Sequence, residues 1–352
     1  MRIATLANAS VVHTRRWVEH FRRRGHEVRL WSLEPAPEAL RAEPTRAAAL
    51  PGFLRYPLAV PPLRAALARF DPDLVDAHYV PNYGLMGALA GRHPLVVTAW
   101  GSDLLIAGRR DPLQRARARF VLRRADRVLA DSGNLAAAAR ELGAEPSRVI
   151  EIPWGIDPER FRPAPARENG LLLSTRMHEA VYDLETVIRG AAPLLAARAD
   201  LRLVIAGEGS RRNALEKLAG DMLPRDRFTF VGRLDPDALA SWLGRAEIYL
   251  SASRSDSTSV SLLEAMASGA IPVVSDIAGN REWVSEGEGA RMFGVSDPAG
   301  CARALSAALG DPAWRERARV RNARVIEERG LWPRNLERIE TLFQELAAAR
   351  RA

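Results

Sequence analysis

Short apolar runs alternate with helix-patterned segments along the whole chain. The first run, residues 1–6, leads through a polar loop into residues 14–24, where Trp17 and Phe21 recur at helical spacing. Gly25 ends this predicted helix, and a new apolar run begins directly after it. The strands predicted in the first half of the chain are residues 1–6, 28–31, 74–78, 95–99 and 127–130. Largely apolar strands that are separated by helices predict a parallel sheet with helices on both faces.

A second alternating series follows residues 153–167, a proline-rich stretch whose irregular composition marks a linker. The predicted strands of this series are residues 171–174, 201–206, 228–231, 248–250 and 271–275. The predicted helices are residues 184–195, 211–219, 237–243 and 256–267. The pattern therefore predicts an α/β protein with two doubly wound, Rossmann-like domains. Ligands of such sheets bind outside the carboxyl ends of the strands, so two domains that face each other would share a cleft.

Length and composition agree with two globular domains. The 352 residues exceed one ordinary core, and a content of 47% hydrophobic and 27% charged residues is typical of a globular protein. The single cysteine, Cys301, excludes an intramolecular disulfide and indicates a reducing compartment. No apolar run approaches the roughly 18 residues of a membrane span, and the amino terminus lacks the apolar region of a secretory signal. We therefore expect a cytoplasmic protein.

The net charge of +8 raises the question of an anionic partner. The basic residues are spread along the chain without any helix-turn-helix, zinc-finger or RNA-recognition motif, so we expect no specific nucleic-acid partner. The densest basic segment, residues 109–127, has apolar residues at helical spacing. It is interpreted either as a solvated helix face or as a patch that meets anionic lipid, which would place the protein at the inner face of the membrane.

The segment DSTSVSLLE, residues 256–264, is the most informative motif. Asp256 and Glu264 bracket a run of small hydroxyl residues and the start of an apolar helix. The free N–H groups and the dipole of a helix N-terminus attract an anion, and small side chains let a phosphate or a sugar approach closely. An acid at each end can accept hydrogen bonds from sugar hydroxyls, which favours a nucleotide-sugar. The alternative is that Ser, Thr and Asp only cap the helix.

Other polar residues directly follow predicted strands. Arg176 comes just after the strand at 171–174, where a guanidinium suits bidentate binding of phosphate, although a structural ion pair would also explain it. Gly207 and Gly209 follow the strand at 201–206, where they are expected to hold a tight turn.

Several segments spread over nearly the whole chain resemble one protein family. They are RRRGHEV at 22–28, DLVDAHYVPNYG at 73–84, VVTAWGSDLL at 96–105, IPWGIDPERFRP at 152–163, IAGEGSRR at 205–212, FVGRL at 230–234 and, most specifically, residues 249–282. The chain resembles the retaining glycosyltransferases of family 4, which have the two-domain GT-B fold with a central cleft. The resemblance implies an acceptor-binding domain at 1–163, a nucleotide-sugar-binding domain at 164–325, and a last helix at 326–352 that packs back towards the first domain.

The resemblance also implies roles for individual residues. Glu264 would hold the ribose hydroxyls, Asp256 would meet hydroxyls of the donor sugar, and Arg176 would neutralise the diphosphate. These three are the predicted catalytic residues. The remaining predicted donor-binding residues are Gly207, Gly232, Arg233, Ser257, Thr258, Ser259, Val260 and Ser261. The predicted acceptor-binding or cleft residues are His13, His78, Tyr79, Trp100, Gly101 and Asp103, of which His13 could equally be structural.

The chain departs from the family pattern at several positions. The first acid is Asp256 where the family usually has Glu, and Val181 stands in place of a phosphate-binding lysine. Arg233, Arg281 and His178 are candidates for the missing cation. Val12 and His13 replace the usual pair of glycines after the first strand, and Trp100 replaces the usual histidine.

The function that the resemblance implies is retaining transfer of a sugar from a nucleoside-diphosphate-sugar to the hydroxyl of a glycan, lipid-linked or small-molecule acceptor. No metal and no cofactor are expected, because a helix N-terminus and Arg176 would stabilise the leaving diphosphate. No convincing nucleophile is found, so front-face attack by the acceptor is expected. A sugar-nucleotide epimerase, a phosphorylase and a non-catalytic binding protein of the same fold are the alternatives.

Overall fold

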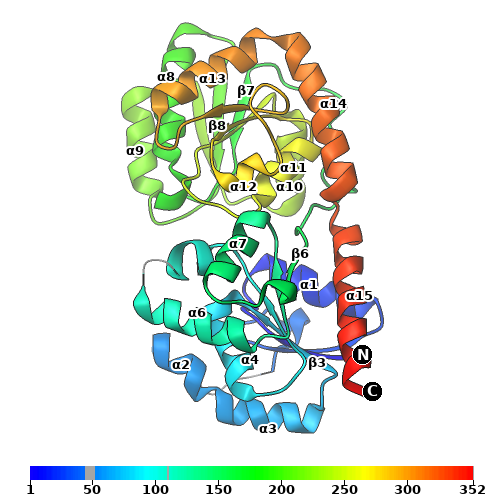
Figure 1. Cartoon of the computed structure of the whole chain (residues 1–352). Coiled ribbons are helices and arrows are strands. Elements are labelled where there is room, and N and C mark those ends of the chain that lie inside the picture. Colours follow the sequence, from blue (N-terminus) through cyan, green and yellow to red (C-terminus); the bar gives the residue numbers. More distant parts are fainter. Residues whose placement is uncertain (44–51, 109–110, 352) are drawn as a thin grey trace. The chain divides into compact units, whose positions relative to one another are not determined.

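The computed structural model describes residues 1–43, 52–108 and 111–351 (Figure 1). The chain divides into two compact units. Unit 1 comprises Met1–Ile152 and Leu336–Ala352, and unit 2 comprises Pro153–Asn335. The chain thus enters unit 2 at Pro153, before the expected boundary at 163, and returns to unit 1 at Leu336. None of the helices within the described ranges has the length and the apolar character needed to cross a bilayer.

Unit 1 is built on a parallel sheet of six strands in the order β2-β1-β3-β4-β5-β6. The strands are β1 Arg2–Leu6, β2 Glu27–Trp31, β3 Leu74–His78, β4 Leu95–Thr98, β5 Arg127–Ala130 and β6 Val149–Glu151. The helices are α1 Val12–Arg23, α2 Gly52–Leu58, α3 Val60–Phe70, α4 Leu85–Ala90, α6 Pro112–Arg124, α7 Gly133–Glu141 and, from Leu336 onwards, α15 Trp332–Arg351. Two π-helical turns, η3 Tyr79–Gly84 and η4 Asp103–Ala107, follow β3 and β4. The three-residue strand β6 is too short to stand out in the sequence pattern.

The last helix, α15, closes unit 1. Phe343 stacks on Phe21 of α1 with ring centroids 5.3 Å apart. Glu340 accepts a hydrogen bond from Nε of Arg24 at 3.0 Å, and its other oxygen lies 2.9 Å from Nε2 of His26. One face of α15 therefore packs an aromatic ring on α1 and places a carboxylate beside the residues just after α1. The residues of α15 from Leu336 onwards belong to unit 1 for this reason.

Unit 2 has a second parallel sheet of six strands, in the order β12-β11-β10-β7-β8-β9. The strands are β7 Leu171–Ser174, β8 Arg202–Ala206, β9 Phe228–Gly232, β10 Ile248–Ser251, β11 Ile271–Ser275 and β12 Arg291–Phe293. The helices are α8 Leu184–Ala197, α9 Arg212–Met222, α10 Pro236–Arg245, α11 Val260–Ala267, α12 Ala278–Arg281, α13 Pro298–Gly310 and α14 Pro312–Arg329. The predicted alternation and parallel sheets are confirmed in both units.

Each sheet reverses its strand order at one point. In unit 1 the chain runs from β1 to β2 and then returns to place β3 on the other side of β1. In unit 2 it runs from β7 through β8 to β9 and then places β10 on the other side of β7. The connections at such a switch point leave in opposite directions and open a crevice at the carboxyl ends of the two strands. The residues after β1 and β3, and those after β7 and β10, are therefore the ones each sheet offers to a ligand.

Candidate functional site

The switch point of unit 2 brings Arg176 to the segment before α11. Arg176 follows β7, is 7% exposed, and donates through Nη2 to Oδ2 of Asp256 at 2.6 Å. Its Nη1 donates to the hydroxyls of Ser259 at 2.8 Å and Ser261 at 2.6 Å. Burial alone would lower the pKa of Arg176, but the adjacent carboxylate of Asp256 raises it above its usual value. Arg176 is therefore a permanent cation that ties three residues of the DSTSVSLLE segment together.

Two tyrosines that sequence reasoning missed complete this arrangement. The ring of Tyr182 lies under the guanidinium of Arg176, 4.1 Å from its carbon, and the hydroxyl of Tyr249 lies 2.8 Å from that of Ser261. The Nε atom of Arg176 is buried and has no hydrogen-bond partner within the described part of the chain. A guanidinium has five N–H groups, so Nε and the second hydrogen of Nη2 are the donors not assigned to a protein acceptor. An anion at this point could accept from them.

Helix α11 begins at Val260, later than the predicted start at Asp256. Ser259 is its N-cap residue, but no side chain caps the N-terminus among the residues described, because the hydroxyl of Ser259 accepts from Arg176 instead. The helices α10, α13 and α14 have an aspartate that accepts from their first amides. The interpretation that the hydroxyl residues only cap this helix is therefore wrong for Ser259. The amides of Leu262 and Leu263 donate to the carbonyl of Ser259, so Val260 and Ser261 are the first residues whose N–H groups α11 itself does not use, and they lie at the positive end of its dipole.

The other predicted donor residues surround the same end of the sheet. Glu264 lies on α11 and is 8% exposed, and Ser257, Thr258 and Ser259 are buried, while Val260 and Ser261 are half-buried. Gly207 follows β8 with φ at +121°, and a β-carbon there would lie 2.6 Å from the carbonyl oxygen of Arg176, so its role in packing is clear. Gly232, with φ at +71°, ends β9, and its carbonyl accepts from the amide of Gly207 at 2.7 Å.

Helix α12 holds the segment before α11 from the other side. A β-carbon on Gly279 would lie 2.0 Å from the carbonyl oxygen of Ser257 and 2.7 Å from that of Asp256. Both contacts are with backbone, which cannot swing away. Gly279 therefore lets α12 touch the segment that carries Asp256, and the sequence signal for it was only a glycine in the predicted loop at 276–282.

The three candidates for the missing cation at Val181 differ in the structure. Arg281 is committed to Asp276, with Nε and Nη2 donating to its two oxygens at 2.5 and 2.7 Å. His178 is completely buried, and burial, aided by Arg212, lowers the pKa of His178, so it carries no charge at neutral pH. Arg233 is exposed and has no acidic partner among the described residues. Arg233 is thus the one uncommitted cation of the three.

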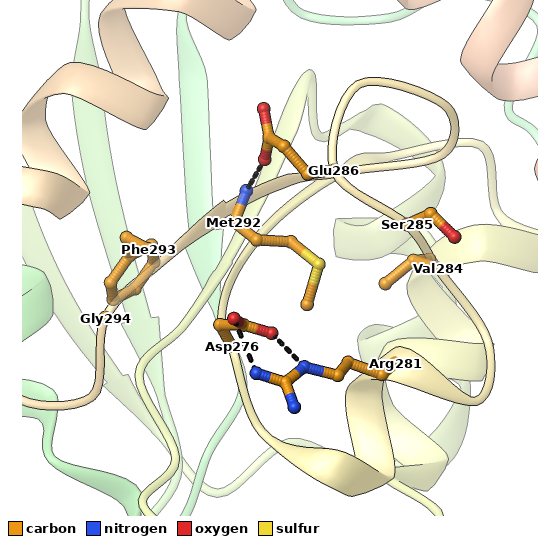
Figure 2. Close-up of a pocket in the computed structure, with 8 residues that line it drawn as sticks. All are labelled: Asp276, Arg281, Val284, Ser285, Glu286, Met292, Phe293 and Gly294. Carbon is orange, nitrogen blue, oxygen red and sulfur yellow. Dashed lines mark hydrogen bonds and ion pairs between the residues drawn. The ribbon is translucent and has the colours of Figure 1, made fainter.

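Figure 2 shows the Arg281–Asp276 pair at the edge of a cavity of about 470 Å³. Its lining residues are Asp276, Arg281, Val284, Ser285, Glu286, Met292, Phe293 and Gly294. The amide of Met292 donates to Glu286, and both residues line this cavity. None of the predicted donor residues lines it. We therefore do not assign this cavity to the donor.

In unit 1 the predicted residues at the switch point form a buried chain of hydrogen bonds. Nε1 of Trp100 donates to Nδ1 of His78 at 3.1 Å, and Nε2 of His78 lies 2.9 Å from Oδ2 of Asp76. Nε1 of Trp17 donates to the same oxygen at 2.8 Å, and the hydroxyl of Thr98 donates to the other at 3.2 Å. Asp76, Trp17 and Thr98 were not predicted as site residues. A carboxylate in the middle of an apolar strand was the signal that could have identified them.

Asp103 fastens the ends of β3 and β4 to each other. It is completely buried, and its oxygens accept from the amides of Val80 at 3.0 Å, Trp100 at 3.1 Å and Leu104 at 3.0 Å. Burial raises the pKa of Asp103 to about 6, although these amides act in the opposite direction. Tyr79 and Gly101 on either side have φ values of +66° and +92°. Asp103 thus positions both loops, and its predicted contact with acceptor stays a prediction.

His13 lies at the start of α1, next to Trp100. The two rings meet edge to face with centroids 5.9 Å apart. Burial, and to a lesser extent Arg16, lower the pKa of His13 to about 4. His13 is therefore neutral at physiological pH and is no phosphate-binding cation.

Within the described ranges, no cluster of three or more His, Cys, Asp or Glu residues is arranged to hold a metal ion. What unit 2 does contain is a buried guanidinium set against an uncapped helix N-terminus, flanked by two carboxylates. This is an arrangement for an anion that also carries hydroxyl groups.

Two family profiles together match most of the chain. The profile described as Glycosyltransferase Family 4 matches residues 10–160, and the profile described as Glycosyl transferases group 1 matches residues 168–311. This chain belongs to the group 1, family 4 glycosyltransferases. The resemblance inferred from the motifs is therefore confirmed.

Relatives and solved structures agree with this family. A D-inositol 3-phosphate glycosyltransferase from Acidothermus cellulolyticus is 30% identical over 251 residues, which are 66% of this chain and 56% of that protein. The chain spans about half the length of the first curated relatives it matches. Sucrose-phosphate synthase from Thermosynechococcus elongatus has a TM-score of 0.87 at 20% identity, with 99% of this chain and 100% of that chain covered. The Anabaena protein HepE, solved in complex with UDP-glucose, has a TM-score of 0.81 at 16% identity, with 98% and 100% covered. The predicted GT-B fold is confirmed.

Proposed function

We propose that this family 4 member is a retaining, metal-independent glycosyltransferase that moves a sugar from a nucleoside-diphosphate-sugar to a hydroxyl acceptor. The observation that carries the proposal is the meeting of Arg176 with the uncapped N-terminus of α11 at the switch point of unit 2. Both groups stabilise the negative charge that develops on a departing diphosphate. Family membership supplies the reaction class.

In the proposed reaction, the bond between the anomeric carbon and the diphosphate oxygen breaks, and a bond from that carbon to the acceptor oxygen forms on the same face. The proton of the acceptor hydroxyl passes to the departing phosphate oxygen, so no protein nucleophile is required. Arg176 and the amides of Val260 and Ser261 at the start of α11 hold the diphosphate, and Asp256 accepts from the donor sugar. Glu264 accepts from the ribose hydroxyls. These roles are inferred from the family and from the position of each residue around α11.

Arg233 suits a more remote part of the donor. It follows β9, which is separated from β7 by β8, and neighbouring strands are about 4.8 Å apart. The end of β9 is therefore roughly 10 Å from that of β7. We propose that Arg233 contacts the nucleoside side of the donor and that Arg176 is the main diphosphate cation.

The first experiment is a thermal-shift screen of the full chain against UDP-, GDP- and ADP-sugars. Every donor that stabilises the protein is then assayed for release of nucleoside diphosphate with and without a panel of hydroxyl acceptors. NMR of the product gives the anomeric configuration. Transfer with retained configuration, unchanged by EDTA, supports the proposal.

Other outcomes identify the rival functions. Binding of a donor without any turnover points to a non-catalytic binding protein. Release of nucleotide in the absence of an acceptor, together with inversion of configuration at a carbon of the sugar ring, points to an epimerase. A requirement for inorganic phosphate points to a phosphorylase. A matched pair of variants tests the site itself: Arg233→Gln should weaken donor binding, whereas Arg225→Gln, at another exposed arginine of unit 2, should not.

We further propose that the protein works at the cytoplasmic face of a membrane through α6. Arg115, Arg119 and Arg123 are exposed on successive turns of α6, and none has an acidic partner in the part of the chain that the structure describes. Leu113 on the same helix is 51% exposed. Residues 109–110 of the predicted basic segment lie outside the described residues. Unpaired arginines beside an exposed leucine favour an anionic lipid surface.

Helix α2 extends this surface. Helix α4 packs against both α2 and α6, so the three helices form one layer on the same side of unit 1 (Figure 1). Leu54 and Leu58 of α2 are 43% and 53% exposed. Exposed leucines on α2 would enter the interface that the arginines of α6 attract.

Vesicle co-sedimentation tests the lipid proposal. The chain should bind phosphatidylcholine vesicles that contain phosphatidylglycerol and should not bind pure phosphatidylcholine. Changing Arg115, Arg119 and Arg123 to Gln should weaken binding by about 10²-fold, since each basic residue contributes about 1 kcal/mol at such a surface. A control that changes three arginines of unit 2, Arg303, Arg317 and Arg324, to Gln removes the same charge. Equal losses in both triple variants would mean that net charge and not α6 attracts the vesicles.

A further inference from the structure

The buried hydrogen-bond chain in unit 1 ends at one half-buried ring. Asp76, His78 and Trp17 are each at most 1% exposed, whereas Trp100 is only partly buried. Trp100 lies two residues after the end of β4, the strand that pairs with β3 beside the switch point between β1 and β3. In this network a buried carboxylate orients a buried imidazole, and the imidazole orients the indole of Trp100. Burying these polar groups costs free energy, and the result of the hydrogen bonds is a fixed position of the indole.

The direction of each hydrogen bond follows from the donor inventory. An indole N–H can only donate, so Nδ1 of His78 must be the acceptor at 3.1 Å. The imidazole hydrogen is then on Nε2, which donates to Asp76 at 2.9 Å. Both ring nitrogens of His78 are therefore committed inside the protein. His78 cannot serve as the base for an acceptor without breaking this chain, and its role is to position Trp100.

Further contacts fix the indole from the other directions. The amide of Trp100 donates to Asp103, and its ring meets His13 and His78 edge to face at 5.9 and 5.7 Å. Because its N–H donates to His78, the exposed part of the indole presents apolar carbon to a ligand and no hydrogen-bond donor. Val12, 45% exposed, lies next to His13 at the start of α1 and adds apolar surface.

We propose that Trp100 is a stacking platform for a ring-shaped acceptor, a pyranose or similar cyclic polyol, and that His78 and Asp76 hold the platform in place. The C–H groups of a pyranose give one of its faces apolar character, which matches an aromatic face, whereas an open-chain polyol has no such flat face. This inference rests on the proposed glycosyltransferase function and adds the class of acceptor to it.

The test compares methyl glycopyranosides with the corresponding alditols as acceptors, with the donor found by the screen above. Wild type should transfer to at least one methyl glycopyranoside with a kcat/KM at least tenfold above that for its alditol. Trp100→Ala should raise the acceptor KM about tenfold and leave the donor KM within twofold. Trp242→Ala, which removes another half-buried tryptophan in unit 2, should change neither KM.

A second pair of variants tests the positioning residues. Trp100→Phe keeps an aromatic face and needs no hydrogen-bond acceptor. His78→Gln should therefore raise the acceptor KM strongly when Trp100 is present and much less in the Trp100→Phe background. Equal effects of His78→Gln in both backgrounds would show that His78 is merely structural and would overturn the positioning role.

The two proposals fail in different ways. Donor turnover without any preference for ring acceptors, or an acceptor KM that Trp100→Ala leaves unchanged, overturns the platform. No turnover of any nucleotide-sugar overturns the proposed function itself.

Discussion

Replacing Arg176 by methionine should destabilise unit 2 as well as impair catalysis. Methionine keeps the length of the side chain but removes the cation that forms an ion pair with the carboxylate of Asp256. That carboxylate side chain is only 19% exposed, and the Arg176 side chain only 8%. Breaking a buried ion pair by removing one partner costs about 3–5 kcal/mol. Because water can still reach part of Asp256, we expect the lower end, about 3 kcal/mol.

Hydrogen exchange localises this effect in a protein of two units. A loss of about 3 kcal/mol should speed exchange of the α11 amides by roughly 10²-fold, since 1.4 kcal/mol corresponds to a factor of ten. Amides of α7 in unit 1 serve as the internal reference. The matched control is Arg198→Met, which breaks an ion pair with Asp200 whose side chains are 43% and 60% exposed, so that water screens both charges and the pair contributes little.

A double variant separates loss of the pair from loss of a contact. Arg176→Met combined with Asp256→Asn removes both charges of the ion pair, so more than half of the lost protection in α11 should return. If Arg176→Met alone affects α11 no more than Arg198→Met does, the reasoning about a buried pair is refuted. If the double variant is as unstable as the single one, the hydrogen bonds to the serine hydroxyls carry the stability instead.

Three other variants and one treatment follow from the same geometry. Gly279→Ala should lower donor kcat/KM by about 10²-fold, because a displacement of about 1 Å in the Asp256 segment misplaces the donor. Gly220→Ala, at a glycine with open space around it, should leave kcat/KM unchanged. Glu264→Gln should weaken nucleoside diphosphate binding by about 10- to 100-fold in calorimetry, and an unchanged affinity would remove Glu264 from the site. The pKa of His13 is lowered from 6.5 to about 4, so between these pH values the unfolded chain binds a proton that folded unit 1 does not. The stability that is present above pH 6.5 is therefore lost as the pH falls towards 4, by up to about 1.4 kcal/mol per pH unit. Urea titrations should show a smaller loss for His13→Gln. EDTA should leave turnover unchanged, whereas activity that returns only with added Mg²⁺ would contradict the proposed mechanism.

Much of the fold could be predicted from the sequence because apolar periodicity is a local property. Of the twelve strands within the described residues, ten correspond to runs of apolar residues, whereas β6 and β12 have only three residues each and give no clear period. The start of α11 was misplaced because Ser257, Thr258 and Ser259 have the composition of a helix cap. A contact with Arg176, distant in sequence, holds the hydroxyl of Ser259 instead.

The sequence by itself determined two doubly wound sheets, the family, and the residue types at the strand ends. Those features depend on neighbours along the chain and on motifs of fixed spacing. Only the tertiary structure decided which of these residues pair. In the structure Arg281 forms an ion pair with Asp276, and His178 is buried and uncharged. His78 is hydrogen-bonded to both Asp76 and Trp100. These hydrogen bonds and the burial of these residues depend on which strands lie next to each other in the sheet. The spacing of residues along the sequence does not give the order of the strands, so the switch point of each sheet becomes known only from the tertiary structure.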